Sequence, residues 1–113
     1  MRTVTLEVSS REEANRRFLR AFEGRPQGAF ISFETPALLF KVLTQKRWEL
    51  LSAMTGAGPL TLREAARRVE RDVKAVHGDV HALLGAGILQ KTAEGRIVFP
   101  FDAVRVNFVL KAA

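Results

Sequence analysis

The chain has 113 residues, of which 47% are hydrophobic and 27% charged, which suits a single soluble globular domain and leaves no room for a second one. The absence of cysteine excludes disulfides and thiolate chemistry and suits a reducing cytoplasm. There is no secretory signal, and no apolar run approaches the roughly 18 residues of a membrane span, so we expect a cytoplasmic protein without a membrane partner.

The formal net charge is +6, and most of the excess lies in the middle of the chain. Residues 1–40 carry six basic and five acidic side chains, residues 41–96 carry ten and six, and residues 97–113 carry two and one. A basic excess on one segment is the electrostatic footprint of a nucleic-acid partner, although a solvated basic face would give the same count.

The first 35 residues predict a β-α-β unit. Residues 3–8 alternate polar and apolar side chains as a strand does, and Ser9 or Ser10 can cap a helix that runs to about Phe22. A second alternating strand contains Ala29, Ile31 and Phe33, after chain breakers at Gly24, Pro26 and Gly28. The side of the helix that we expect to be buried consists of Ala14, Phe18, Ala21 and Phe22.

Two further helices are predicted before residue 57. Thr35–Pro36 starts a short helix, and Thr44 caps another that ends near Gly56. The expected core residues of the short helix are Leu38, Leu39, Val42 and Leu43. Those of the following helix are Trp48, Leu51 and Met54.

The segment from Thr61 to Leu84 predicts two amphipathic helices joined by a very short turn. Thr61 and Glu64 fit a capping box, and Asp72 caps the second helix. Gly85 or Gly87 can end that helix. The expected buried stripes are Leu62, Ala65, Ala66 and Val69 on the first helix, and Val73, Val76, Val80, Leu83 and Leu84 on the second. Only Glu70 and Arg71 lie between the helices, so they must turn sharply.

A hairpin is predicted next. Ile88 and Leu89 begin one strand, Ile97 to Phe99 form the return strand, and Thr92 to Gly95 make the turn. Two helices with a short turn, followed by a hairpin with a basic tip, are typical of a winged helix-turn-helix. The predicted fold class is therefore α+β: a winged helix-turn-helix in residues 36–113, with an N-terminal β-α-β extension in residues 1–35 and a C-terminal closing strand.

The closing strand is apolar on both faces. Val104, Val106, Phe108 and Leu110 alternate with Arg105, Asn107, Val109 and Lys111. A strand of this kind needs cover on both sides. We expect residues 1–35 and 102–111 to form a homodimer interface or a docking surface for another protein; the alternative is that they pack on the winged helix of the same chain.

The chain also resembles a family. The run R-D-V-K-A-V-H-G-D-V-H-A-L-L-G-A-G-I-L (Arg71–Leu89), preceded by L-T-Q-K-R-W-E-L-L (Leu43–Leu51), is similar to small prokaryotic winged helix-turn-helix regulators. The resemblance covers roughly Leu39 to Leu110 and implies binding to double-stranded DNA. Many such regulators are encoded beside a toxin-like protein and are proposed antitoxins. The position of Gly78 is often basic in them, so a contact expected there is absent from this chain.

Catalytic and metal sites have little support. His77 and His81 have the spacing of a metal pair, but they are the only histidines and no cysteine accompanies them. The chain has no G-x-S-x-G, P-loop or glycine-rich dinucleotide motif. We expect no enzyme activity, no metal and no cofactor.

The predicted function is that of a sequence-specific DNA-binding transcriptional regulator, a repressor or the antitoxin of a toxin-antitoxin pair. The alternative is a winged helix used only for protein interaction. Arg71 and Lys74 are expected where the recognition helix enters the groove, and Arg67 and Arg68 at phosphates. The expected DNA-binding residues are Arg63, Arg67, Arg68, Arg71, Lys74, Ala75, Gly78, His81, Lys91 and Arg96.

Overall fold

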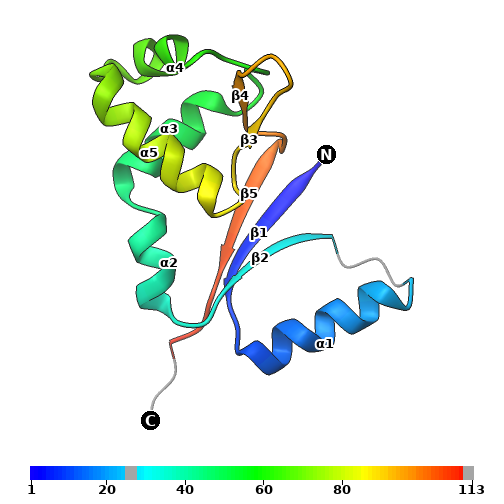
Figure 1. The fold of residues 1–113 in the computed structure, drawn as a ribbon. Coiled ribbons are helices and arrows are strands. Elements are labelled where there is room, and N and C mark those ends of the chain that lie inside the picture. Colours follow the sequence, from blue (N-terminus) through cyan, green and yellow to red (C-terminus); the bar gives the residue numbers. More distant parts are fainter. Residues whose placement is uncertain (25–27, 111–113) are drawn as a thin grey trace.

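The computed structural model describes residues 1–24 and 28–110, which form an α+β fold. Pro26 and Lys111, used in the sequence predictions, lie outside the described residues. Figure 1 shows the elements in this order: β1 (Thr3–Val8), α1 (Arg11–Phe22), β2 (Ala29–Phe33), α2 (Pro36–Val42), α3 (Gln45–Met54), α4 (Leu62–Val69), α5 (Val73–Gly85), β3 (Gln90–Lys91), β4 (Ile97–Val98) and β5 (Ala103–Asn107).

Segments from both ends of the chain share one sheet. Its strand order is β2-β1-β5, and both pairings are parallel, with Val4 opposite Ala29 on one side and Val104 on the other. The start of β1 is fixed next to β5, because the Arg2 backbone N–H donates to the Asp102 carboxylate at 2.7 Å. The predicted extension and the predicted closing strand therefore belong to the same structural layer.

The core joins this sheet to the helices. Val4 and Leu6 of β1 lie in the same hydrophobic cluster as residues of α2 to α5 and of the hairpin. The most deeply buried members from the helices are Leu39, Leu50, Met54, Ala65, Val76 and Leu83. The hairpin and its flanking residues contribute Ile88, Leu89, Ile97 and Phe99 to the core. The small Ala65 and Ala66 let α4 approach its neighbours closely.

Each helix begins at a side-chain cap. The capping residues are Ser10, Thr35, Thr44, Thr61 and Asp72, and each accepts a hydrogen bond from a backbone N–H of the first turn. At α4 the predicted capping box is confirmed, since the Thr61 N–H donates to Glu64 at 3.1 Å and the Glu64 N–H donates to Thr61 at 3.1 Å. These local bonds explain why the predicted helix starts are correct.

The predicted burial of α1 is wrong. None of its twelve residues, all of which the structure describes, is buried, and Phe18 and Phe22 are 68% and 83% exposed. Helical spacing predicts which side chains share a face, but it does not say whether a neighbour covers that face. The prediction is also wrong for Leu38, Trp48 and Val73, which are exposed at the outer margins of the core.

The closing strand is shorter than predicted. β5 ends at Asn107, so Phe108 and Leu110 lie beyond it. Phe108 instead packs edge-to-face against Phe40 of α2, with ring centroids 5.5 Å apart. This aromatic contact holds the chain after β5 against the side of the molecule that α2 forms.

Candidate nucleic-acid interface

The turn between α4 and α5 is closed by backbone hydrogen bonds. Glu70 adopts a left-handed conformation with φ of 53°, and its N–H donates to the Arg67 carbonyl at 3.2 Å. The Arg71 N–H reaches back to the Ala66 carbonyl at 3.1 Å. This pair of bonds is a Schellman motif, which ends α4 and lets α5 start after only Glu70, Arg71 and the cap Asp72. The α4–α5 angle is thus fixed locally.

One face of α5 is open to solvent and carries mostly short or basic side chains. Lys74, Gly78 and His81 follow at i, i+4 and i+7, and all three are exposed, as is the neighbouring Ala75. A Cβ atom added at Gly78 would meet no atom within 4 Å. His77 lies at the margin of this face, with its ring stacked on that of His81 at a centroid distance of 6.3 Å. The position of Gly78 is therefore open, with the two stacked imidazoles beside it.

The side chain of Arg71, in contrast, is largely buried and forms an ion pair. Its Nη1 forms an ion pair with the Asp79 carboxylate at 2.8 Å, and only 18% of its side chain is exposed. Arg47 of α3 donates from Nε to the other oxygen of Asp79 at 3.0 Å. Arg47 also donates to the carbonyls of Lys41 and Val42 at the end of α2. Asp79 thereby connects α5 to α3, to α2 and to the turn.

The protonation of Asp79 reflects these contacts. Burial alone would raise the pKa of its carboxyl, but hydrogen bonds from Arg47 and Arg71 outweigh burial and hold that pKa below its usual value. Neither Arg47 nor Asp79 is among the residues that the sequence predicts for the site. The available signal was the position of Asp79, the one acid inside α5, next to the buried Val76 and Val80.

The basic residues of α4 face more than one direction. Arg63, Arg67 and Arg68 are all exposed. Arg68 lines a shallow hollow together with Trp48 and Glu49 of α3. Hydrogen bonds from the Thr61 backbone N–H and then from its hydroxyl lower the pKa of the Glu64 carboxyl, and the charges of Arg96 and then Arg67 lower it further. Arg68 therefore lies on the side of α4 that borders α3, while Arg67 lies near Glu64 of its own helix.

The hairpin places two more basic residues beside α5. Gln90 pairs with Val98 and Lys91 with Ile97, and Gly95 supplies the positive φ of the turn, as predicted. Lys91 and Arg96 are exposed, and Arg96 lies 3.9 Å from Glu64 of α4. A groove between α5 and the hairpin is lined by Leu62, His77, Val80, His81, Leu84 and Lys91.

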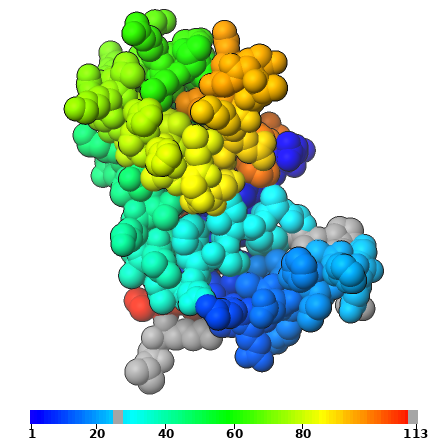
Figure 2. Space-filling view, in the orientation of Figure 1, coloured from blue at the N-terminus to red at the C-terminus, as the bar shows by residue number. Residues whose placement is uncertain are grey.

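These parts gather at one end of the molecule. Figure 1 places α4 and the hairpin at the end opposite α1, and Figure 2 shows the surfaces of α5 and the hairpin lying side by side. The hairpin is fixed to the body because Leu60 and Ile97 exchange two backbone hydrogen bonds of 2.8 Å. The surface of α5 thus lies beside a hairpin that backbone hydrogen bonds hold in place.

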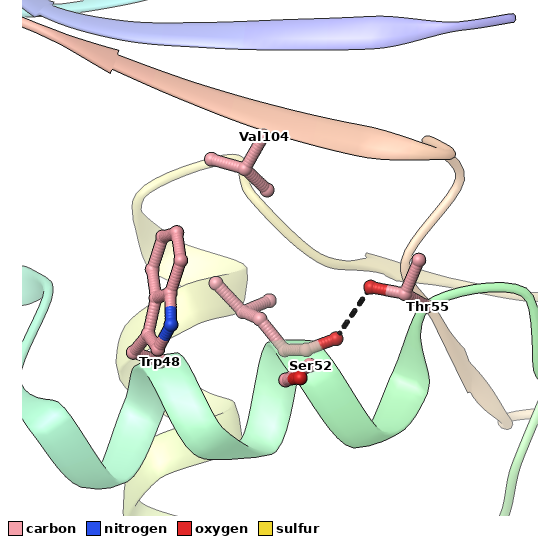
Figure 3. Close-up of a pocket in the computed structure, with 5 residues that line it drawn as sticks. Trp48, Ser52, Thr55 and Val104 are labelled. Atoms are coloured by element: carbon pink, nitrogen blue, oxygen red, sulfur yellow. Dashed lines mark hydrogen bonds between the residues drawn. The ribbon is translucent and has the colours of Figure 1, made fainter.

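A second hollow, shown in Figure 3, has a different character. Trp48, Leu51, Ser52, Thr55 and Val104 line it between α3 and β5. The Thr55 hydroxyl donates to the Leu51 carbonyl at 2.8 Å and is therefore already occupied as a donor. The lining has no charged side chain, so it offers no cationic group to a phosphate.

No group of three or more His, Asp or Glu side chains in residues 1–24 and 28–110 is placed to hold a metal ion. Within the same ranges, no helix is both long enough and apolar enough to cross a bilayer.

Comparison with known proteins gives one family. The model of the family described as HVO_A0114 matches residues 42–106, more than half of the chain, so the protein belongs to this family. The match runs from the last residue of α2 into β5 and leaves out β1, α1 and β2. No curated protein and no solved structure matches the chain.

Proposed function

We propose that this member of the HVO_A0114 family binds double-stranded DNA through α5 and acts as a transcriptional regulator. The observation that carries the proposal is the open face of α5, where Lys74, Ala75, Gly78 and His81 leave room for a closely approaching surface. A recognition helix needs short or basic side chains on the face that enters the major groove, because bulk would keep it out.

In this proposal α3, α4, α5 and the β3–β4 hairpin form a winged helix-turn-helix. Lys74 lies near the N-terminus of α5, the end of a recognition helix that meets base edges. Arg63, Arg67 and Arg68 flank the helix and contact phosphates. Lys91 and Arg96 of the hairpin reach the backbone or minor groove alongside. Arg71 takes a different part: its ion pair with Asp79 makes it a residue that positions α5.

The proposed mechanism is occlusion. A homodimer bound to a two-fold operator blocks polymerase and needs no cofactor, and it works in the cytoplasm, where the DNA is. One winged helix covers a short half-site, so pairing two of them raises specificity. The same molecule can serve as an antitoxin if a toxin-like protein is encoded beside it, and the neighbouring gene is the first thing to inspect.

The test is a gel shift with the DNA upstream of the protein's own gene. Wild-type protein should bind this duplex more tightly than a scrambled duplex of equal length. Lys74→Ala should lose that preference, and Lys41→Ala, an exposed lysine on α2, should keep it. Equal binding to both duplexes by the wild type would remove sequence-specific recognition from the proposal.

The rival function is a winged helix that binds only protein. It is favoured by Gly78, which leaves the centre of the α5 face without a basic side chain, and by the pairing of Arg71 with Asp79. The same gel shift separates the two functions, since the rival predicts no binding to any duplex even at low salt.

A further inference from the structure

A polar hollow lies where the parallel sheet meets the start of α1. Its lining includes Glu7 and Ser9 at the end of β1, Asn107 at the end of β5, and Glu13 and Arg17 of α1. Figure 1 shows α1 starting next to the ends of these two strands. The hollow has a volume of about 300 Å³, far more than the roughly 10–15 Å³ that one water molecule needs. It therefore has room for a small molecule.

The hollow occupies the place where open parallel sheets usually bind their ligands. β1 is the middle strand, and the chain passes from it to β2 on one side and later returns as β5 on the other side. The direction of the connections thus reverses between β1 and β5. The crevice at the carboxyl ends of such a strand pair is the usual ligand site of an open sheet. Glu7 and Asn107 lie opposite each other in the register of these strands, so both belong to this crevice.

Ser9 brings a buried hydroxyl that lacks a hydrogen-bond partner within the described part of the chain. The residue is 6% exposed, and its Oγ accepts and donates no hydrogen bond there. Its backbone N–H donates to the Phe33 carbonyl at 3.0 Å, which continues the strand and puts Ser9 on the same sheet face as Glu7. Most buried polar side-chain atoms are paired, so an unpaired one at a hollow points to a group that is bound there.

The charges that line the hollow favour a cation. Glu7 is buried and forms an ion pair with Arg17, so these two charges compensate each other. Glu13 is exposed and accepts from the Ser10 hydroxyl at 3.2 Å, and it forms no ion pair with any residue that the structure describes. The N-terminus of α1 adds only about half a positive charge, which does not cancel this carboxylate. One unpaired carboxylate beside a guanidinium suits a singly charged ammonium group better than a divalent metal ion.

We propose that this hollow binds a small primary amine. Its ammonium group pairs with Glu13, and a second polar group of the same molecule forms hydrogen bonds with Ser9 and Asn107. None of the residues that line the hollow belongs to α4, α5 or the hairpin. The inference therefore does not depend on DNA binding, and its test needs no DNA.

Ethanolamine is the probe, because it carries one ammonium and one hydroxyl group. Titration of isotope-labelled wild-type protein, followed by NMR at pH 7, should shift the amide signals of Ser9, Glu13 and Asn107 along a saturable curve. Ethylene glycol, which lacks the charge, and sodium chloride at equal ionic strength should leave these signals in place. The proposal is overturned if ethanolamine gives no saturable shift at millimolar concentration, or if calcium ions move the same signals at lower concentration.

Variants of the wall test the assigned roles. Glu13→Gln should raise the Kd for ethanolamine about tenfold or more, because it removes the charge and keeps a side chain that can serve in the helix cap. Glu12→Gln is the matched control: Glu12 pairs with Arg16 and does not line the hollow, so the Kd should stay nearly unchanged. An equal Kd in the two variants overturns the role of Glu13.

Ser9→Ala separates a bound amine from a permanent partner of the hydroxyl. It should raise the Kd for ethanolamine and leave the melting temperature of the free protein unchanged or higher, because the hydroxyl that it removes is unpaired. A lower melting temperature of the free variant would mean that a fixed water molecule already pairs with Ser9, and this outcome overturns its part in the site.

Discussion

At the scale of single residues, Asp79 has the most consequential contacts in the proposed DNA-binding unit. It accepts from Arg47 and pairs with Arg71, and only 14% of its side chain is exposed. Removing one partner of such a group leaves charges without compensation in a partly buried place. The orientation of α5 therefore depends on a carboxylate that sits beside the proposed reading face and outside it.

We expect Asp79→Asn to lower the free energy of unfolding at pH 7 by about 2–4 kcal/mol. The folded pKa of Asp79 lies below the unfolded value of about 3.9, so the stabilisation is fully present above that value and is lost as the pH falls through the folded pKa. Urea unfolding at pH 7 and pH 3 should show the difference between wild type and variant shrinking in acid. Glu49→Gln, on the exposed side of α3, is the control, and an equal difference at both pH values would contradict the assignment.

Substitutions of Arg71 and of Lys74 should have different effects, although the two residues lie only three positions apart. Arg71→Ala should lower the melting temperature, because it breaks the ion pair with Asp79. Lys74→Ala should change the free energy of unfolding by no more than about 0.5 kcal/mol. It should change the difference in binding free energy between the preferred DNA sequence and other sequences by about 1–3 kcal/mol. Thermal melts combined with competition binding check both variants. If Arg71→Ala changes the preferred DNA sequence without lowering stability, Arg71 contacts DNA and does not only position α5.

At the scale of elements, the decisive feature of α5 is the glycine inside it. Gly78 has an ordinary helical backbone and open space at its missing Cβ. Gly78→Ala should therefore raise the free energy of unfolding by about 0.8–1 kcal/mol, the usual difference in helix propensity. Chemical denaturation measures this, and a loss of stability would mean that another surface covers the position.

Gly78→Arg uses the same position to ask whether α5 faces DNA. If it does, the new guanidinium should tighten duplex binding and steepen the salt dependence by about one additional phosphate contact. Ser52→Arg, on an exposed position of α3, adds the same charge elsewhere and serves as the control. Equal effects of the two variants would mean that the gain comes from net charge alone.

Elements with local signals were predictable from the sequence. The caps at Ser10, Thr61 and Asp72 and the turn at Gly95 are set by residues within a few positions of the bond they make. The exposure of α1 and the contacts of Asp79 were not predictable. Both depend on which segment, distant in sequence, packs against a given face of the helix. The parallel pairing of β5 with β1 is of the same kind: alternation predicts a strand but does not identify its partner.

At the scale of the whole molecule, the proposed function makes binding depend on salt. If about five basic residues per protomer neutralise phosphates, the slope of log K against log salt should be about −4 to −5 per protomer. A dimer on a two-fold site should show about twice that value. Fluorescence anisotropy across a salt series measures the slope, and a value near zero at moderate salt would contradict electrostatic contact with a duplex.

The pairing of β1 with β5 also bears on how the protein folds. Thr3 lies beside Ala103, so the middle strand of the sheet gains its second neighbour only when residues about a hundred positions apart in sequence meet. Contacts of such long range close slowly, whereas α3 to α5 depend mainly on near neighbours. During synthesis α3 to α5 can therefore form while the edge of β1 that will pair with β5 is still unpaired. A chaperone that shields this edge would have most effect on a chain still attached to the ribosome.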